Sequence, residues 1–253
     1  MNGVLGITLQ SMQNDMKRLE KIANNTANVS TPGYKREIVI EHSFGDVMTN
    51  QVHDAVQNRS IPNFVESVSD QSAATLKATG TKLDFAISGP GFFEISTKNG
   101  IAYTRKGNFH LDPRGRLVTE SGDAVLGVEG ELIFKDENVK CDGDGRLYAQ
   151  EMSAGDGHLT ERLIGQLKIV GFEAPEKLVK RDGGLFVASG EMTPSNSKQG
   201  TLMQGHLENS NVNSMDEMMH LMQTMRHFES MMRLTQGYDE MIGTAIKKFS
   251  DIA

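Results

Sequence analysis

The sequence predicts an α+β fold in which long N- and C-terminal helices pair as a coiled coil and flank a central, mainly antiparallel β domain. Two observations support this prediction. At both ends of the chain, apolar residues recur at three- and four-residue steps, the period of an amphipathic helix. Between them, short β-branched and aromatic runs alternate with Gly-rich turns, which is typical of antiparallel strands.

Residues 4–27 have the pattern of an amphipathic helix. Leu5, Met12, Leu19 and Thr26 lie seven residues apart on one face. That face carries few large apolar groups, and a lone helix of this length is marginal in water. We therefore expect this helix to be ordered only against a partner.

The first helix is expected to end in an Asn-rich segment followed by a turn. Asn24, Asn25 and Asn28 can satisfy the free carbonyl groups of the last helical turn or reach a neighbouring chain. Two interpretations remain open: a plain helix exit, or a set of contacts between subunits. Pro32 and Gly33 mark the turn, because Pro disfavours helical angles in the residue before it.

The segment after this turn begins extended and then becomes weakly patterned. Residues 34–41 contain the β-branched run 38–40, which is typical of a strand. Residues 43–80 are polar, with one short strand expected near 64–65. We interpret them as a long connector, and loops of this length are usually functional or flexible.

From about residue 81 to residue 188 the sequence predicts short antiparallel strands. Asn99-Gly100 is a strong hairpin signal, because this dipeptide tolerates the positive φ angles of a type I′ turn. It is expected to join strands at 92–95 and 101–104. Further strands are expected at 84–87, 108–112, 116–119, 131–134, 138–141, 146–149, 163–172 and 185–188.

After a polar linker, residues 214–249 have the pattern of a helix roughly 50 Å long, at 1.5 Å per residue. Ser214 and Glu217 have the spacing of a capping box. Eight Met residues lie between Met215 and Met241, and flexible Met suits a surface that contacts several neighbours, so we favour an interface over an ordinary helix core. Two apolar stripes run along the helix: Met218, Leu221, Met225, Phe228, Met232, Ile242, Ile246 and Phe249; and Met231, Leu234, Tyr238, Met241 and Ala245.

These elements divide the chain into five parts. Residues 1–34 and 214–253 are predicted to form the two halves of one helical assembly domain. A β-rich domain at 81–190 lies between an extended connector at 35–80 and a linker at 191–213.

The composition argues against several classes of function. Acidic residues outnumber basic ones, 33 to 26, and no segment is strongly basic, so nucleic acid is not an expected partner. Cys141 is the only cysteine, which rules out an intramolecular disulfide and a cysteine-based metal site. No apolar run approaches the roughly 20 residues that cross a bilayer, so no membrane insertion is expected, and no cleaved signal peptide is recognisable.

No catalytic, cofactor-binding or metal site is predicted. Residues 142–145 resemble the start of a calcium loop but lack the downstream Glu, so a β-turn is the better interpretation. His220 and His227 lie seven residues apart, which is not the spacing of a zinc pair. Nucleophile-elbow, phosphate-loop and dinucleotide motifs are missing from the sequence. We therefore expect no enzymatic activity and no cofactor.

Three separated segments resemble bacterial flagellar rod and hook proteins. Residues 23–35 are similar to the N-terminal signature of that family, with Thr26 where Leu is usual. Residues 84–93 and 103–109 resemble its core β signature, and residues 205–213 resemble the segment that leads into its C-terminal helix.

The resemblance implies an axial protein of the flagellum, which self-assembles into a tube that transmits motor torque. It implies export through the flagellar type III apparatus without a cleaved signal peptide, and a place in the periplasm-spanning rod of the basal body, near peptidoglycan. The partners would be other copies of the chain, neighbouring rod proteins and the export apparatus. The terminal helices would form the inner coiled-coil tube, with the β domain outside it.

The family member that the sequence resembles most is the proximal rod protein. Residues 226–229 match the Arg-x-Phe-Glu pattern of the proximal rod better than the Arg-Ala-Tyr-Glu of distal rod and hook proteins. A distal rod or hook-type protein is the alternative. The assembly residues are expected to be Leu5, Met12, Leu19, Asn24, Asn25, Asn28, Pro32, Gly33, Tyr34, Asn211, Asn213, Met218, Leu221, Met225, Phe228, Met232, Tyr238, Met241 and Ile242.

Two functions of other classes compete with this interpretation: a β protein that binds peptidoglycan or another glycan, and a soluble adaptor whose Met-rich helix binds a partner groove. Against a glycan site, the chain has four Tyr, no Trp and no pair of carboxylates beside an aromatic platform. A glycan binder should pull down peptidoglycan as a monomer, whereas an axial protein should polymerise when concentrated.

Overall fold

The chain separates into two compact units, each built from segments far apart in the sequence. The helical unit comprises residues 1–27, 37–68 and 213–253, and the β unit comprises residues 28–36 and 69–212. The computed structural model describes residues 2–41, 65–134, 138–152, 159–188, 194–195 and 200–250.

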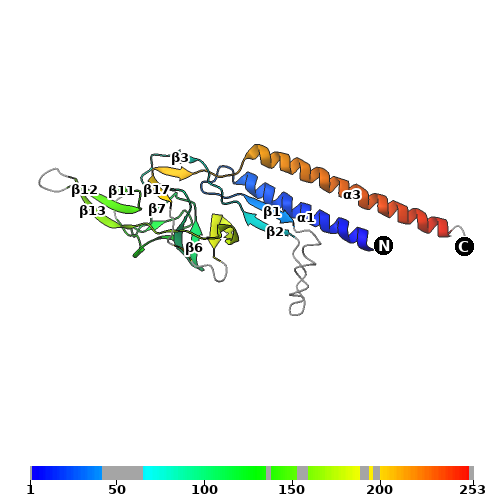
Figure 1. The fold of residues 1–253 in the computed structure, drawn as a ribbon, viewed down its shortest axis with the longest axis horizontal. Helices are drawn as coiled ribbons and strands as arrows, with labels where there is room; N and C mark the ends of the chain where they lie inside the picture. Colours follow the sequence, from blue (N-terminus) through cyan, green and yellow to red (C-terminus); the bar gives the residue numbers. More distant parts are fainter. Residues whose placement is uncertain are drawn as a thin grey trace. The chain divides into compact units, whose positions relative to one another are not determined.

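The helical unit pairs α1 (Asn2–Ala27) with α3 (Ser214–Ser250). The two helices run antiparallel, and the start of α1 and the end of α3 lie at the same end of the pair (Figure 1). Beside α1, β1 (Glu37–Glu41) forms a two-stranded sheet with β2 (Val65–Ser69). Among the described residues, neither helix has an apolar stretch long enough to cross a membrane.

The prediction that the two helices pair as a long coiled coil is wrong in that form. The helices do pack together, but α1 has 26 residues and α3 has 37. A coiled coil needs apolar side chains along its seam. Here Ile22 is a buried apolar residue on α1, whereas the other fully buried side chains of the described pair are polar: Asp15, Asn25, Glu217 and Thr224. Both helices have the predicted apolar periodicity, but most of their large apolar groups lie beside the contact rather than in it.

In its described residues, the β unit has one sheet of nine strands and three smaller sheets. The order in the large sheet is β15-β16-β6-β5-β9-β8-β7, with β10 paired to β9 and β14 to β5. The smaller sheets are β11-β12-β13, β17-β4 and β18-β3, and their pairings are antiparallel.

These strands are short, and their bounds follow. They are β3 (Leu76–Ala78), β4 (Phe85–Ser88), β5 (Phe92–Thr97), β6 (Gly100–Thr104), β7 (His110–Leu111), β8 (Leu117–Val118), β9 (Ala124–Gly127), β10 (Gly130–Glu131), β11 (Val139–Cys141), β12 (Arg146–Met152), β13 (Leu159–Gln166), β14 (Ile169–Val170), β15 (Val179–Arg181), β16 (Leu185–Val187), β17 (Thr201–Gln204) and β18 (His206–Glu208). Two 3₁₀ turns, η1 (Pro175–Lys177) and η2 (Asp182–Gly184), flank β15.

The hairpin predicted at Asn99-Gly100 is confirmed. It joins β5 to β6, with Thr97 paired to Gly100. Gly100 has φ of 113°, a backbone conformation that residues other than Gly rarely adopt. Several strands were not expected. β3 lies in the segment interpreted as a connector, β9 and β15 lie between expected strands, and β17 and β18 lie in the stretch interpreted as a linker.

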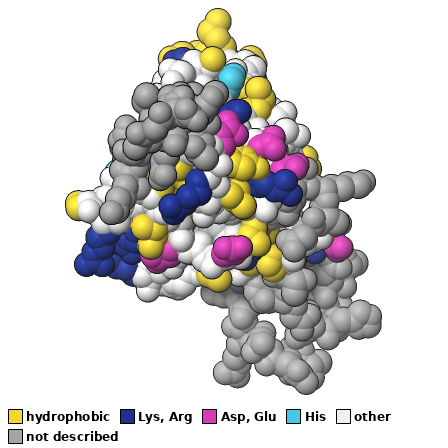
Figure 2. Space-filling view, turned by 90° about the vertical axis from the view of Figure 1, so that its left-hand side faces the viewer, with side chains coloured by type: hydrophobic (Ala, Val, Ile, Leu, Met, Phe, Trp, Pro, Cys, Tyr) yellow, Lys and Arg dark blue, Asp and Glu magenta, His cyan; other side chains and the backbone are white. Residues whose placement is uncertain are grey.

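The face shown in Figure 2 carries Lys and Arg, Asp and Glu, and hydrophobic side chains in a mixed arrangement. Charges of both signs lie close to one another on this face, in keeping with the modest net charge of −7. Such a surface has no broad field of a single sign.

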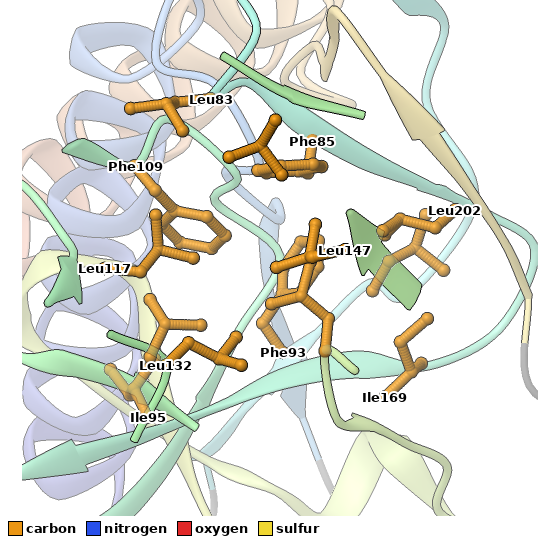
Figure 3. Packing of buried hydrophobic residues seen from close by; sticks show 14 of the residues in the cluster. Leu83, Phe85, Phe93, Ile95, Phe109, Leu117, Leu132, Leu147, Ile169 and Leu202 are labelled. Carbon is orange, nitrogen blue, oxygen red and sulfur yellow. The ribbon is translucent and has the colours of Figure 1, made fainter. Parts of the chain in front are cut away.

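Two apolar clusters lie on opposite faces of the β5–β6 part of the large sheet. Neighbouring strand residues point to opposite faces, so Phe93 enters the main cluster and Phe92 enters the second one. In the main cluster the Phe93 ring meets the Phe109 ring edge-on, with centroids 5.1 Å apart (Figure 3). The second cluster contains Phe92, Tyr103, Val170, Leu178 and Phe186.

Candidate functional site

Asn25 connects three elements of the helical unit. Its Nδ2 donates to the carbonyl oxygen of Glu37, and its Oδ1 accepts from the Glu37 N–H, each at 2.9 Å. The same Nδ2 lies 3.4 Å from Glu217 Oε2. The side chain therefore joins α1, β1 and α3. Of the other Asn residues in this segment, Asn24 is exposed and Asn28 is half-buried.

Gly33 occupies a position in the β unit where a side chain does not fit. Its φ is 66°, and a Cβ there would lie 2.6 Å from the carbonyl carbon of Arg105. Its N–H donates to the carbonyl oxygen of Glu208 at 2.7 Å. Next to it, Tyr34 is buried, and Lys180 Nζ lies 3.6 Å from the centre of its ring, a cation–π contact. These contacts hold residues 28–36 against the rest of the β unit.

Lys35 is buried within an ionic cluster. The residue is 1% exposed, and Nζ lies 2.7 Å from Glu208 Oε1 and 2.7 Å from the carbonyl oxygen of Ser72. Arg105 Nη1 lies 3.5 Å from the second oxygen of Glu208. Burial lowers the pKa of both Lys35 and Arg105, and the Glu208 carboxylate acts in the opposite direction. One carboxylate thus contacts two buried cations.

Asn211 ties the returning chain to the segment that follows α1. Its Oδ1 accepts from the Arg36 N–H at 2.7 Å, and its Nδ2 donates to the carbonyl oxygen of Asp70 at 2.9 Å. An Asn amide can hold two backbone groups in this way because it is both donor and acceptor. Asn211 therefore bonds within its own chain.

Asn213 caps the N-terminus of α3. Its Oδ1 accepts from the Met215 N–H at 3.1 Å, and its carbonyl oxygen accepts from the Glu217 N–H at 3.0 Å. The capping role expected for Ser214 therefore belongs to the residue before it, a shift of one position in a helix boundary.

The apolar residues expected to form the assembly face of α3 are divided between two environments. Leu221, Phe228 and Tyr238 are half-buried on the side that contains the buried Glu217 and Thr224. Met218, Met225, Met232, Met241 and Ile242 are exposed. Of the remaining expected assembly residues, Met12, Leu19 and Pro32 are half-buried, and the side chain of Leu5 lies outside the described residues.

A cavity of about 370 Å³ lies in the helical unit, near the N-terminal end of α1. Thr8 of α1 and Tyr238 of α3 line it. The other lining residues are Arg233, Leu234, Thr235, Gly237 and Met241. Its apolar lining adds to the exposed apolar surface of α3.

Sequence reasoning missed two buried polar contacts. His227 Nδ1 lies 2.7 Å from Asp15 Oδ2, and the Asp15 side chain is 2% exposed. The Lys35–Glu208 pair was also missed. Charged residues are usually solvated, so neither contact has a signal in hydrophobic periodicity. Among the described residues, no group of His, Cys, Asp and Glu is arranged to hold a metal ion.

Family models of known proteins match two of the three segments that resemble flagellar proteins. The family described as "Flagellar hook protein FlgE/F/G D1 domain" matches residues 86–151, within the β unit. The family described as "Flagellar basal body rod FlgEFG protein C-terminal" matches residues 203–248, which include β18 and most of α3.

Individual relatives match over almost their whole length. A protein of Buchnera aphidicola subsp. Acyrthosiphon pisum named "Flagellar basal-body rod protein FlgG" is 33% identical over 241 residues, covering 87% of this chain and 90% of the relative. The FlgG of Bacillus subtilis is 30% identical over 260 residues, with 92% and 94% coverage. The FlgF of Mesorhizobium japonicum is 29% identical over 252 residues, with 96% and 98% coverage. The chain therefore belongs to the flagellar basal-body rod protein family, as a structural subunit of the rod in the bacterial flagellar basal body.

Proposed function

We propose that the chain is a non-catalytic axial subunit of the proximal rod, and that it assembles with other copies of itself and with neighbouring rod proteins through the exposed face of α3. The observation that carries the proposal is the exposure of methionine. Of the eight Met residues between Met215 and Met241, seven are exposed.

Three of the exposed Met residues lie on one flank of the helix. Met218, Met222 and Met225 follow one another at steps of four and three residues and are 54%, 55% and 49% exposed. Burying apolar side chains of this size is favourable by roughly 1.5–3 kcal/mol each. Because Met is unbranched and polarisable, one such flank can fit more than one neighbour. A subunit that contacts both its own copies and other rod proteins needs that adaptability.

Assignment to the proximal rod rests on residues 226–229, whose Arg-x-Phe-Glu pattern resembles that position. Relatives named FlgG and relatives named FlgF match at similar identity, so overall identity does not separate the two kinds. A distal rod or hook-type subunit is the competing assignment. Export through the flagellar type III apparatus, without a cleaved signal peptide, belongs to the same proposal and is supported by family membership.

The proposal is tested by adding charge to the Met flank. Met222→Glu with Met225→Glu should abolish rod assembly, because an unpaired charge in an apolar contact costs several kcal/mol in every subunit. The subunit should still be exported, and its β unit should stay folded. The readout compares secreted subunit with subunit in purified basal bodies.

Met222→Glu alone should also weaken assembly, and its matched control is Gln223→Glu, which adds one charge to the same exposed stretch of α3, about 100° around the helix from Met222. This control should assemble normally. Full-length rods built from the Met222→Glu, Met225→Glu chain would show that this flank is not an assembly surface. To place the subunit, chains that lack a neighbouring rod protein should be examined: a proximal subunit should remain on basal bodies that lack the distal rod.

A further inference from the structure

Two polar contacts lie at separate points along the α1–α3 contact. Asp15 meets His227 at 2.7 Å, and Asn25 meets Glu217 at 3.4 Å. Asp15, Asn25 and Glu217 are almost completely buried, and His227 is half-exposed.

Both contacts report the same antiparallel register. Asp15 and Asn25 are ten residues apart on α1, and Glu217 and His227 are ten residues apart on α3. Ten helical residues span about 15 Å. The two contacts therefore belong to the same alignment of α1 with α3, about 15 Å apart along the helices.

Apart from these two contacts, the half-buried side chains of α3 that face α1 do not select a register. The hydrogen bonds of Gly33 and Arg36 to Glu208 and Asn211 hold the segments that join the helices and also limit sliding. On α3, the buried and half-buried residues on the side of α1 repeat every seven positions. Leu221 and Phe228 form one row, and Thr224, Met231 and Tyr238 form another. Sliding α1 by seven residues, about 10.5 Å, would bring equivalent rows into contact. Since α3 is the longer helix, it offers room for such a slip.

Each slipped register breaks at least one polar contact. A slip toward the C-terminus of α3 would place Asp15 opposite Leu234, which leaves a buried carboxylate without its partner. A slip the other way would place Asp15 opposite His220, so the first contact could re-form. That slip would place Asn25 opposite Ser210, before the start of α3, and separate it from Glu217. Only one register satisfies both contacts.

We infer that the Asp15–His227 and Asn25–Glu217 contacts specify the register of α1 on α3. Buried polar residues are known to select register in paired helices at some cost in stability. The selected register places Asn2 opposite Glu240, so the last turns of α3, from Met241 onward, extend beyond α1. The two contacts thus determine which part of α3 is available to other molecules. The inference concerns a single chain and does not depend on the proposed function.

The register is measured by disulfide trapping in the full-length chain carrying Cys141→Ala, kept dilute so that chains do not associate. The observed register places Ser11 opposite Met231, and both are half-buried. Ser11→Cys should therefore cross-link with Met231→Cys, and at least tenfold less with Thr224→Cys or Tyr238→Cys, which report the two slipped registers.

Asp15→Leu with Asn25→Leu should reduce this preference at least tenfold and make a slipped cross-link detectable. The matched control is Lys17→Leu with Ala23→Leu, which changes two exposed residues of the same helix and should keep the native cross-link. Far-UV circular dichroism checks that helix content is retained in both. The inference is wrong if the Asp15→Leu, Asn25→Leu chain still forms only the native cross-link. It is also wrong if the chain with Asp15 and Asn25 unchanged does not form the cross-link between Ser11→Cys and Met231→Cys.

A charge exchange separates register from mere packing. Asp15→His alone should weaken the native cross-link, and Asp15→His with His227→Asp should restore it, because the exchanged pair can form the same contact. Failure of the exchange to restore the preference, with helix content unchanged, would also overturn the inference. Loss of rod assembly in the Met222→Glu, Met225→Glu chain is independent of these outcomes.

Discussion

Lys35 Nζ lies 2.7 Å from Glu208 Oε1, although 173 positions separate the two residues in the sequence. The contact lies inside the β unit, where Gly33 N–H also donates to the Glu208 carbonyl oxygen. The segment after α1 and the segment before α3 are therefore fastened to each other. The same cluster includes Arg105, which donates to the carbonyl oxygens of Ile87 and Gly89.

Removing the carboxylate of this cluster should lower the free energy of unfolding more than removing its lysine. Glu208→Gln leaves two buried cations without their shared anion, and breaking a buried ion pair costs about 3–5 kcal/mol. Lys35→Met leaves Glu208 paired with Arg105, so we expect a loss of no more than about 2 kcal/mol. Urea denaturation followed by circular dichroism measures both. Equal losses in the two variants would contradict a cluster held together by one carboxylate.

The Lys35 contribution should depend on pH in one direction. Burial lowers the pKa of Lys35 below its ordinary 10.5 in the folded state. Between the two values the unfolded state binds more protons, so the free energy of unfolding rises with pH there and is level below the folded-state pKa. The wild-type value minus the Lys35→Met value should therefore increase as the pH approaches 10.5. A difference that stays constant up to that pH would show that Lys35 has its ordinary pKa.

Asn25 and Asn24 should differ sharply when each is replaced by Ala. Asn25→Ala removes the partner of both backbone groups of Glu37, and a buried polar group left unpaired costs about 1–3 kcal/mol. Hydrogen exchange at the Glu37 amide should speed up about tenfold or more. Asn24 is exposed, so Asn24→Ala should change that rate little. Indistinguishable exchange rates would mean that the Asn25 contacts do not protect β1.

Cys141 should be nearly inert in the folded chain. Burial, aided by the nearby Asp142 charge, raises the pKa of its thiol to about 12. Because the thiolate is the reactive species, alkylation by iodoacetamide at pH 8 should be roughly a thousandfold slower than for a thiol of ordinary pKa. The same reaction in guanidinium chloride provides the reference rate. A folded-state rate within tenfold of that reference would refute the raised pKa.

Local signals in the sequence predicted much of the secondary structure. The hairpin at Asn99-Gly100 depends on two residues and their backbone angles, so it could be located without knowledge of the fold. The long C-terminal helix has a helical period over its whole length, and it was placed within a residue of its observed start. In contrast, β17 and β18 are short, and they exist because β4 and β3 offer unpaired edges. A partner more than a hundred positions away leaves no local signal.

The candidate site shows a similar division. The Met-rich flank of α3 follows from helical spacing, and the structure shows those side chains exposed. The expectation that these Asn and Gly residues act between subunits stays a prediction. Asn25, Gly33 and Asn211 have intrachain contacts in this structure. Asp15, Lys35 and Glu208 could not be identified from the sequence, because a buried charge looks like a surface charge until its partner is known.

The late position of β17 and β18 has a consequence for a chain that emerges from a ribosome N-terminus first. The edge of β4, complete at Ser88, pairs with Thr201–Gln204, more than a hundred residues later. At 5–20 residues per second this partner appears after a delay on the order of ten seconds. During that time β3 and β4 present open edges, and Lys35 and Arg105 lack Glu208. An incomplete chain therefore has the exposed strand edges that chaperones bind. The β unit can be completed only after residues 201–208 have been synthesised.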